Sequence, residues 1–104
     1  MRILTFYFKI HQNGNEKIAA ICDEEIRENT FLHNGVKIRV KGEFYGKEIF
    51  EKDEILLELT SCTSINAFGK RICDILIEQK IVHPRTILWI TEGENKIGHV
   101  IAVR

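Results

Sequence analysis

Apolar and polar residues alternate along the first part of the chain, which is the pattern of half-buried strands. Residues 3–10 carry an apolar side chain at every second position. Asn13-Gly14 follows, a dipeptide that favours a tight hairpin turn, and residues 17–22 have the composition of a returning strand. A second turn signal, Asn34-Gly35, leads into an alternating strand at residues 36–40. We therefore expect a β-hairpin over the first 22 residues and a further strand after the second turn.

The hydrophobic period changes after residue 50, from two residues to about 3.6. Before the change, residues 47–50 are expected to form a short strand or an irregular edge. Residues 53–59 then place their apolar side chains on one helical face. A second helix is predicted from about residue 65 to residue 80, with Thr63 or Ser64 as its N-cap.

Two strands are expected in the last part of the chain. Residues 86–91 are almost continuously apolar, which is typical of a strand covered on both faces, and residues 97–103 form the final strand. Together the elements predict a single compact α+β domain over residues 1–104. Its two helices pack on a mainly antiparallel sheet of about five to six strands.

Charge and hydropathy narrow the classes of partner. Basic and acidic residues number 15 each, so the formal net charge is zero and the pI is about 6.9. This balance argues against a whole surface that grips nucleic acid, because phosphate neutralisation needs clustered basic side chains. No apolar run approaches the roughly 20 residues of a membrane span, and the first residues lack a signal-peptide cleavage region. We therefore expect a cytoplasmic protein without a membrane partner.

The residue types that serve catalysis or bind metals are present without their usual spacing. The cysteines form no Cys-x-x-Cys pair and are flanked by apolar residues, so we expect three buried thiols, at Cys22, Cys62 and Cys73. The four histidines show no His-x-x-x-His spacing, and no serine lies in Gly-x-Ser-x-Gly. The pattern assigns no catalytic residue, metal or cofactor, and it favours a non-enzymatic role over an enzyme.

Asp23 opens a short polar segment, residues 23–29, in which we expect one helical turn with Asp23 as its N-cap. A second interpretation pairs the Asp23 carboxylate with His99, on condition that the last strand lies beside the first hairpin. A carboxylate can orient a histidine and favour its charged form. Such a pair would suit a small enzyme.

Asn66 and Gly69 lie one turn apart near the start of the predicted second helix, and hence on one helical face. Glycine inside a helix costs roughly 1 kcal/mol relative to alanine, so Gly69 implies a compensating gain. Close packing of another backbone segment is the favoured explanation, and the approach of a ligand or partner chain is the alternative. The amides of the helix start, with Lys70 and Arg71 nearby, would also suit an anion.

Three basic residues, Lys37, Arg39 and Lys41, form a row on one face of the strand at residues 36–40, and Tyr45 follows. Basic side chains beside an aromatic ring are what a contact with single-stranded RNA needs. An edge strand made charged to prevent aggregation explains the same row.

Five short motifs resemble, in order and spacing, those of the archaeal domain-of-unknown-function family 424. They are Cys22-Asp-Glu-Glu-Ile26, Thr30-Phe31, Phe44-Tyr-Gly-Lys-Glu48, Asn66-Ala-Phe-Gly69 and Gly98-His99. The resemblance covers about residues 17–104. Glu28-Asn29 stands where the family tends to have Gly-Lys, Gly98 where it tends to have Pro, and Val100-Ile101 where it tends to have Ala-Gln. The resemblance implies a role in translation or RNA metabolism and no defined reaction.

Three functional hypotheses follow. The leading one is a non-enzymatic binding module associated with translation through a protein partner such as an initiation factor. Its contact patch would be bordered by Tyr45, Asn66, Gly69, His99 and Asp23. The second is direct RNA binding through Lys37, Arg39, Lys41 and Tyr45. The third is a small enzyme with an Asp23/His99 site. The oligomeric state stays open in all three.

Overall fold

The computed structural model describes residues 4–103 of the chain. Its strands are β1 (Thr5–Asn13), β2 (Glu16–Asp23), β3 (Thr30–His33), β4 (Val36–Arg39), β5 (Ile49–Glu51), β6 (Ser64–Phe68), β7 (Leu88–Glu92) and β8 (Asn95–Val103). Its helices are α1 (Gly42–Tyr45), α2 (Lys52–Leu59) and α3 (Lys70–Glu78), with single 3-10 turns η1 (Glu24–Ile26) and η2 (Pro84–Thr86).

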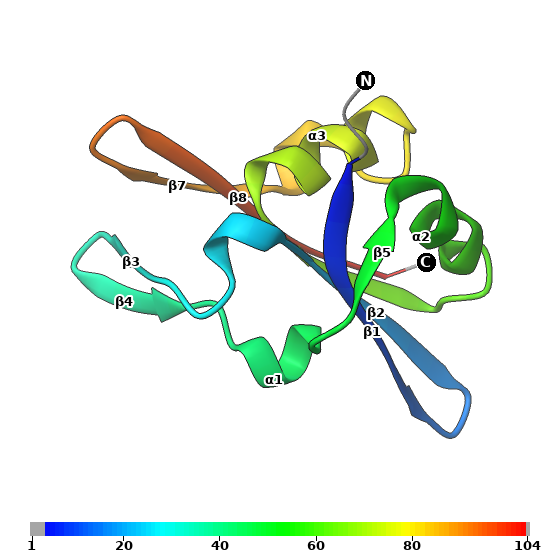
Figure 1. The fold of residues 1–104 in the computed structure, drawn as a ribbon. Helices are drawn as coiled ribbons and strands as arrows, with labels where there is room; N and C mark the ends of the chain where they lie inside the picture. The colour runs from blue at the N-terminus through cyan, green and yellow to red at the C-terminus, as the bar shows by residue number, and fades with distance from the viewer. Residues whose placement is uncertain (1–3, 104) are drawn as a thin grey trace.

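Six of the described strands form one sheet, in the order β5-β1-β2-β6-β8-β7 (Figure 1). The pair β2–β6 is parallel and every other neighbouring pair is antiparallel. Strands β3 and β4 form a separate two-stranded hairpin. The fold is therefore α+β with a mostly antiparallel six-stranded sheet, as the sequence predicted.

Hairpins form at both turn signals of the N-terminal half, but the first turn is shifted by one residue from the predicted Asn13-Gly14. Asn13 still pairs with Glu16, so Gly14 and Asn15 form the turn, and Gly14 has a φ of 61°. Strands β1 and β2 pair continuously from Phe6–Asp23 to Asn13–Glu16, while residue 3 of the predicted strand lies outside the described residues. Asn34 and Gly35 join β3 to β4 with φ angles of 50° and 79°, the left-handed values that this hairpin turn requires.

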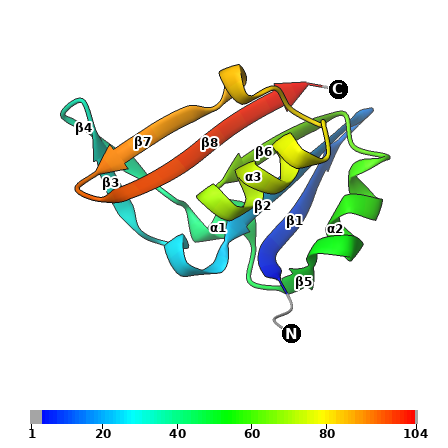
Figure 2. The ribbon, with the colours of Figure 1, turned by 90° about the horizontal axis from the view of Figure 1, so that it is seen from above.

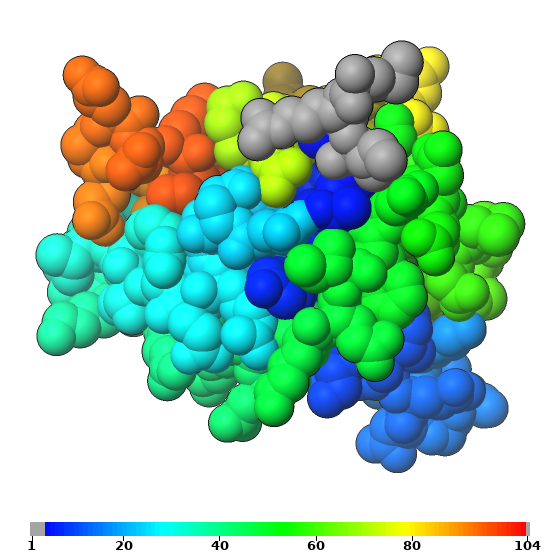
Figure 3. Space-filling view, viewed as in Figure 1, coloured from blue at the N-terminus to red at the C-terminus, as the bar shows by residue number. Residues whose placement is uncertain are grey.

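The tips of three hairpins, β1–β2, β3–β4 and β7–β8, project from the molecule (Figure 3).

The predicted start of the second long helix at Thr63 or Ser64 is wrong. Residues Ser64–Phe68 form β6, which lies between β2 and β8, and α3 begins at Lys70. Ile65, Phe68 and Ile72 fit a helical spacing, but Ile65 and Ala67 also alternate with Asn66. Pairing on both sides satisfies the backbone of this segment and buries Ile65 and Ala67 completely, which outweighs the local helical pattern.

Helices α2 and α3 pack on one face of the sheet, as predicted (Figure 2). The core on this helical face joins residues of both helices to the inward side chains of the central strands, among them Ile55, Leu59, Ile72, Leu76, Phe6, Ile21, Ile65 and Val100. None of the helices within residues 4–103 is long and apolar enough to cross a membrane.

The opposite face of the sheet is covered only in part, by α1 and by the β3–β4 hairpin (Figure 1). A second core forms there from residues such as Cys22, Phe31, Tyr45, Phe68 and Ile90. We call this side the hairpin face.

The strand predicted to be covered on both faces at residues 86–91 is instead an edge strand. Strand β7 begins at Leu88, because Pro84–Thr86 form η2, and it pairs with β8 alone. Ile90 is its one buried residue, and Leu88 is 43% exposed. A run of apolar residues therefore does not distinguish a central strand from a partly exposed edge strand.

Candidate functional site

Three of the predicted site residues meet on the hairpin face. The Tyr45 hydroxyl donates a hydrogen bond of 2.9 Å to Asn66 Oδ1. His99 Nε2 lies 3.2 Å from the same oxygen. Tyr45 comes from α1, Asn66 from β6 and His99 from β8, so three separate elements build this cluster.

Strand register explains why Asn66 and His99 face the same way. Phe68 pairs with His99, and Asn66 pairs with Ile101, so these four side chains leave one face of the sheet. The His99 ring stacks on Phe68, with centroids 4.5 Å apart and planes 23° apart. Stacking on one side and the Asn66 oxygen at its edge hold the imidazole in one orientation.

A cavity of about 250 Å³ opens at this cluster, between the hairpin face, α1 and the end of β4. It is lined by Ile38, Arg39, Lys41, Phe44, Tyr45, Asn66, Phe68 and His99. Aromatic and aliphatic walls with a few convergent polar groups are typical of a binding pocket. We call this cavity the central pocket.

Glu28 positions two elements that border the central pocket. Its carboxylate accepts from the Gly42 backbone N–H at 2.7 Å and from Arg39 Nη2 at 2.5 Å. These contacts tie the start of α1, which carries Tyr45, to the end of β4. Glu28 has a φ of 72°, in the left-handed region that favours glycine.

The three hydrogen-bonded side chains of the cluster, Tyr45, Asn66 and His99, are uncharged at neutral pH. Burial lowers the pKa of His99 and raises that of the Tyr45 phenol above its ordinary range. Because an amide oxygen can only accept, neutral His99 carries its proton on Nε2 and keeps the lone pair on Nδ1. The pocket therefore offers fixed hydrogen-bonding groups, with the Lys41 and Arg39 cations at its border.

Exposed apolar side chains continue from the pocket along the hairpin face of β7 and β8. Ile101, which pairs with Asn66, is 65% exposed, and Val103 is 86% exposed. Leu88 pairs with His99 on the other side. We call Leu88, Ile101 and Val103 the apolar rim. The sequence analysis missed it, because residues 97–103 are apolar at most positions and do not reveal which face stays uncovered.

Asp23 and Gly69 lie in a different place from the central pocket. The Asp23 carboxylate accepts from the backbone N–H groups of Arg71 (2.9 Å) and Ile72 (3.0 Å). The predicted cap of its own turn is wrong, since η1 has no side-chain cap. Asp23 instead caps α3, whose orphan amides are unsatisfied within the helix. Its side chain is almost fully buried at 2% exposure.

Gly69 is required by this capping contact. Its φ is 132°, and a Cβ placed there would lie 2.2 Å from Asp23 Cγ. Its N–H also donates to the Gly98 carbonyl at 2.7 Å. The expected close approach to Gly69 is thus made by this chain itself. The expected helical face shared with Asn66 is wrong, because Asn66 lies on a strand.

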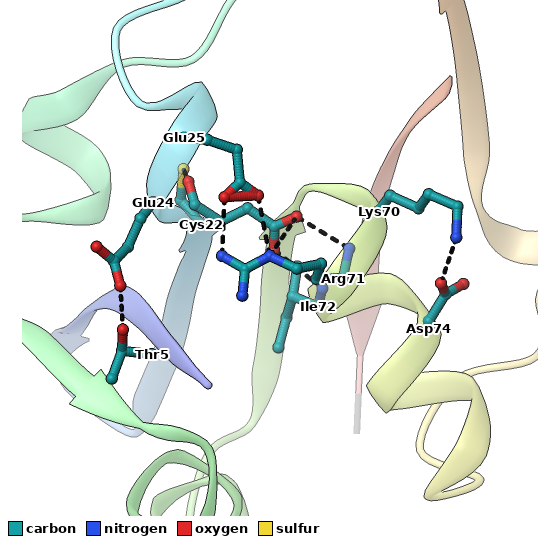
Figure 4. Close-up of polar contacts among 9 residues, drawn as sticks. Thr5, Cys22, Glu24, Glu25, Lys70, Arg71, Ile72 and Asp74 are labelled. Atoms are coloured by element: carbon teal, nitrogen blue, oxygen red, sulfur yellow. Dashed lines mark hydrogen bonds and ion pairs between the residues drawn. The ribbon is translucent and has the colours of Figure 1, made fainter. Parts of the chain in front are cut away.

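We call Asp23, Glu25, Gly69 and Arg71 the Asp23 cluster. In it, burial disfavours the charged Asp23 carboxylate, and nearby hydrogen-bond donors offset part of this effect. Burial raises the pKa of Asp23 to about 6, against the opposing effect of the two N–H bonds and of Arg71. Arg71 makes two bonds of 2.9 Å to Glu25, through Nε and Nη2 (Figure 4). Desolvation opposes ionisation of Glu25, but these bonds lower its pKa below the ordinary value.

The Asp23/His99 pair of the enzyme hypothesis does not form. Cys22, Phe68 and His99 lie in one row across the sheet, so their side chains share the hairpin face. Asp23 follows Cys22 and therefore points to the helical face, where it caps α3. The sheet separates the two side chains.

The basic row predicted for RNA binding has exposed cations, but the aromatic ring predicted beside it is buried. Lys37 and Arg39 are exposed on β4, and Arg39 is paired with Glu28. The Tyr45 ring is only 4% exposed and its hydroxyl is bound to Asn66, so it presents no stacking face for a base.

The cysteines are buried, as predicted. Burial raises the pKa values of Cys22 and Cys73 to about 12, so both thiols stay protonated at neutral pH. Within residues 4–103, no three His, Cys, Asp or Glu side chains gather closely enough to hold a metal ion.

Comparisons with known proteins identify a structure with the same fold and the family of this chain. The crystal structure of an uncharacterized conserved protein from Methanopyrus kandleri is similar to this chain, with a TM-score of 0.74 and 20% sequence identity. The similarity covers 94% of this chain and 90% of that one, and at this identity it shows a shared fold. No curated protein matches the chain. A family model described as "Protein of unknown function (DUF424)" matches residues 10–99, and the chain therefore belongs to this family.

Proposed function

We propose that this protein is a non-enzymatic binding module whose contact surface is the central pocket with its apolar rim. The observation that carries the proposal is the position of the pocket beside three exposed apolar side chains on an incompletely covered sheet face. Apolar patches that a monomer leaves exposed commonly mark sites of protein association. The partner in this proposal is another protein.

The geometry suits one anchoring side chain surrounded by weaker contacts. A cavity of about 250 Å³ accommodates one large side chain, and Phe44, Phe68 and Ile38 supply its apolar walls. Asn66 and His99 provide oriented polar groups at the same place. Binding energy at interfaces is concentrated in such central pockets, while the surrounding contacts exclude water.

Charge at the border indicates the partner's chemistry. Lys41 and Arg39 line the pocket; Arg39 is ion-paired with Glu28, and the pocket lining itself holds no acidic residue. An acidic segment that carries an apolar anchor would complement this border and associate faster at low salt. A partner in the translation apparatus, such as an initiation factor, is part of the proposal, and the family resemblance supports it.

Affinity capture with matched variants tests the proposal. Ile101→Asp places a charge on the apolar rim, and Leu57→Asp places the same charge on α2, at a residue 72% exposed on the other side of the sheet. The tagged proteins are incubated with a lysate of the cells that produce them, with and without ribonuclease. We expect wild type and Leu57→Asp to retain one protein after ribonuclease treatment, and Ile101→Asp to lose it.

Two outcomes would overturn the proposal. Equal recovery by all three proteins would show that the apolar rim is not the contact surface. If the captured protein disappears after ribonuclease treatment, the chain binds RNA instead, through exposed cations such as Lys37 and Lys41.

A further inference from the structure

The outer edge of β1 is only partly paired. Strand β5 covers this edge at three residues, Thr5, Phe6 and Tyr7. One more backbone bond follows, from the Phe8 N–H to the Glu48 carbonyl at 3.3 Å. Strand β1 continues to Asn13, and its inner edge stays paired with β2 along that length. Within residues 4–103, the second half of β1 therefore has no neighbouring strand on its outer side.

The direction of the open backbone groups follows from the Phe8 bond. Since the Phe8 N–H points outward, the N–H groups of Ile10 and Gln12 point outward too, because alternate residues of an antiparallel strand share a direction. Among the described residues, no hydrogen-bond partner of either amide is found on that side. A Cβ built on Gly46 would lie 3.1 Å from the Cβ of Lys9, so the loop between α1 and β5 packs against the Lys9 side chain. The loop therefore passes beneath β1 and leaves its outer edge open.

A cavity of about 540 Å³ lies along this open edge. Phe8, Ile10 and Phe50 line it; Phe8 belongs to the core on the helical face, and Ile10 and Phe50 pack against that core. Phe8 and Phe50 meet edge to face, with centroids 5.6 Å apart. Lys9 and Lys47, with Glu43 and Glu48, supply balanced charges around it. The open backbone groups thus border an apolar floor.

We propose that this groove binds an extended peptide segment of a partner protein, which adds to the sheet as a strand beside β1 in line with β5. The amides of Ile10 and Gln12 would bond to its backbone, as in other complexes in which a peptide extends a sheet. Successive side chains of a strand point to opposite faces. The segment therefore carries an apolar residue over Ile10 and Phe50, flanked by charged or polar residues that meet Lys9, Lys47 and Glu43.

This site is independent of the proposed function. The groove lies at the β1–β5 border of the sheet, and the apolar rim lies on β7 and β8 at the other end of the strand order. Either site can exist without the other.

A displayed library of random 12-residue peptides is the probe. Selected peptides are titrated against wild type, Ile10→Lys and Ile18→Lys, and circular dichroism checks that all three are folded. Both isoleucines are half-buried in the first hairpin, but Ile18 pairs with Ser64 on the hairpin face, away from the groove. We expect Ile10→Lys to weaken binding by at least about tenfold, because the apolar floor is lost, and Ile18→Lys to bind as wild type.

Amide hydrogen exchange of the wild-type complex provides the second readout, and it does not depend on any variant folding. The Ile10 and Gln12 amides should become protected when peptide binds, while the His11 amide, which faces β2, should keep its protection. A library that yields no binder would overturn the proposal. So would peptides that leave both amides exchanging freely, or that bind Ile10→Lys as tightly as wild type.

Discussion

The central pocket and the Asp23 cluster are both built from polar residues that the motifs of this chain single out, yet they differ in what completes them. In the Asp23 cluster, the carboxylate, two helix amides and Arg71 satisfy one another, and Gly69 leaves room for no further group. At the central pocket, Tyr45 and His99 converge on Asn66, and a cavity remains beside them. Conspicuous polar residues thus indicate function only where the chain does not itself fill the space around them.

The largest effect is expected at Gly69. Gly69→Ala should reduce the free energy of unfolding by more than about 3 kcal/mol, because the new Cβ overlaps the buried Asp23 carboxylate and the φ of 132° is strained for alanine. Gly14→Ala is the control. Its φ is 61°, but its Cβ would meet nothing within 4 Å, so it should cost only about 1–2 kcal/mol. Urea denaturation measures both, and equal losses would contradict the capping role given to this contact.

A second effect should appear in the pH dependence of stability. Because burial raises the pKa of Asp23 to about 6, folding favours the protonated carboxyl group. The stabilisation of the fold by the protonated carboxyl group is complete below about pH 4, the pKa of aspartate in the unfolded chain. This stabilisation is lost as the pH rises through about 6. The stability of wild type relative to Asp23→Asn should therefore fall by up to about 3 kcal/mol between pH 4 and pH 7. A difference that stays constant or rises would show that the helix amides outweigh burial.

The smallest effect on stability is expected in the central pocket. Tyr45→Phe removes one hydrogen bond to Asn66 and should cost roughly 1 kcal/mol, since His99 still donates to the same oxygen. Tyr7→Phe is the matched control, because Tyr7 is half-buried on the same face and no hydrogen bond of its hydroxyl is found among the described residues. Thermal unfolding compares the two. A loss at Tyr45 as large as that at Gly69 would mean that the pocket residues serve folding rather than binding.

Local patterns predicted most of the fold. Alternation and turn dipeptides identified the first hairpin, β4 and the two last strands, and the 3.6-residue period identified α2 and the body of α3. Strand β3, the partner of β4, was not predicted. The pattern failed at Ser64–Phe68, where pairing with β2 and β8 decides the structure and the partners are distant in sequence. It failed again at β7, since nothing local shows that a strand lies at an edge.

The site was predictable only where motif residues happen to meet in space. Tyr45, Asn66 and His99 were identified from short motifs, and the strand register brings them together. The partners of Asp23 lie 48 and 49 residues away on α3, so its role could not be read from its neighbours. The apolar rim depends on which sheet face stays uncovered, which is a property of the whole fold.

Site-directed photo-crosslinking tests the binding surface most directly. A photoreactive amino acid replaces Ile101 on the apolar rim or, as the control, Leu57 on α2, and cells producing each protein are irradiated. The proposed function predicts a discrete adduct with one protein from position 101 and none from position 57. No adduct from position 101, or the same adducts from both positions, would contradict it.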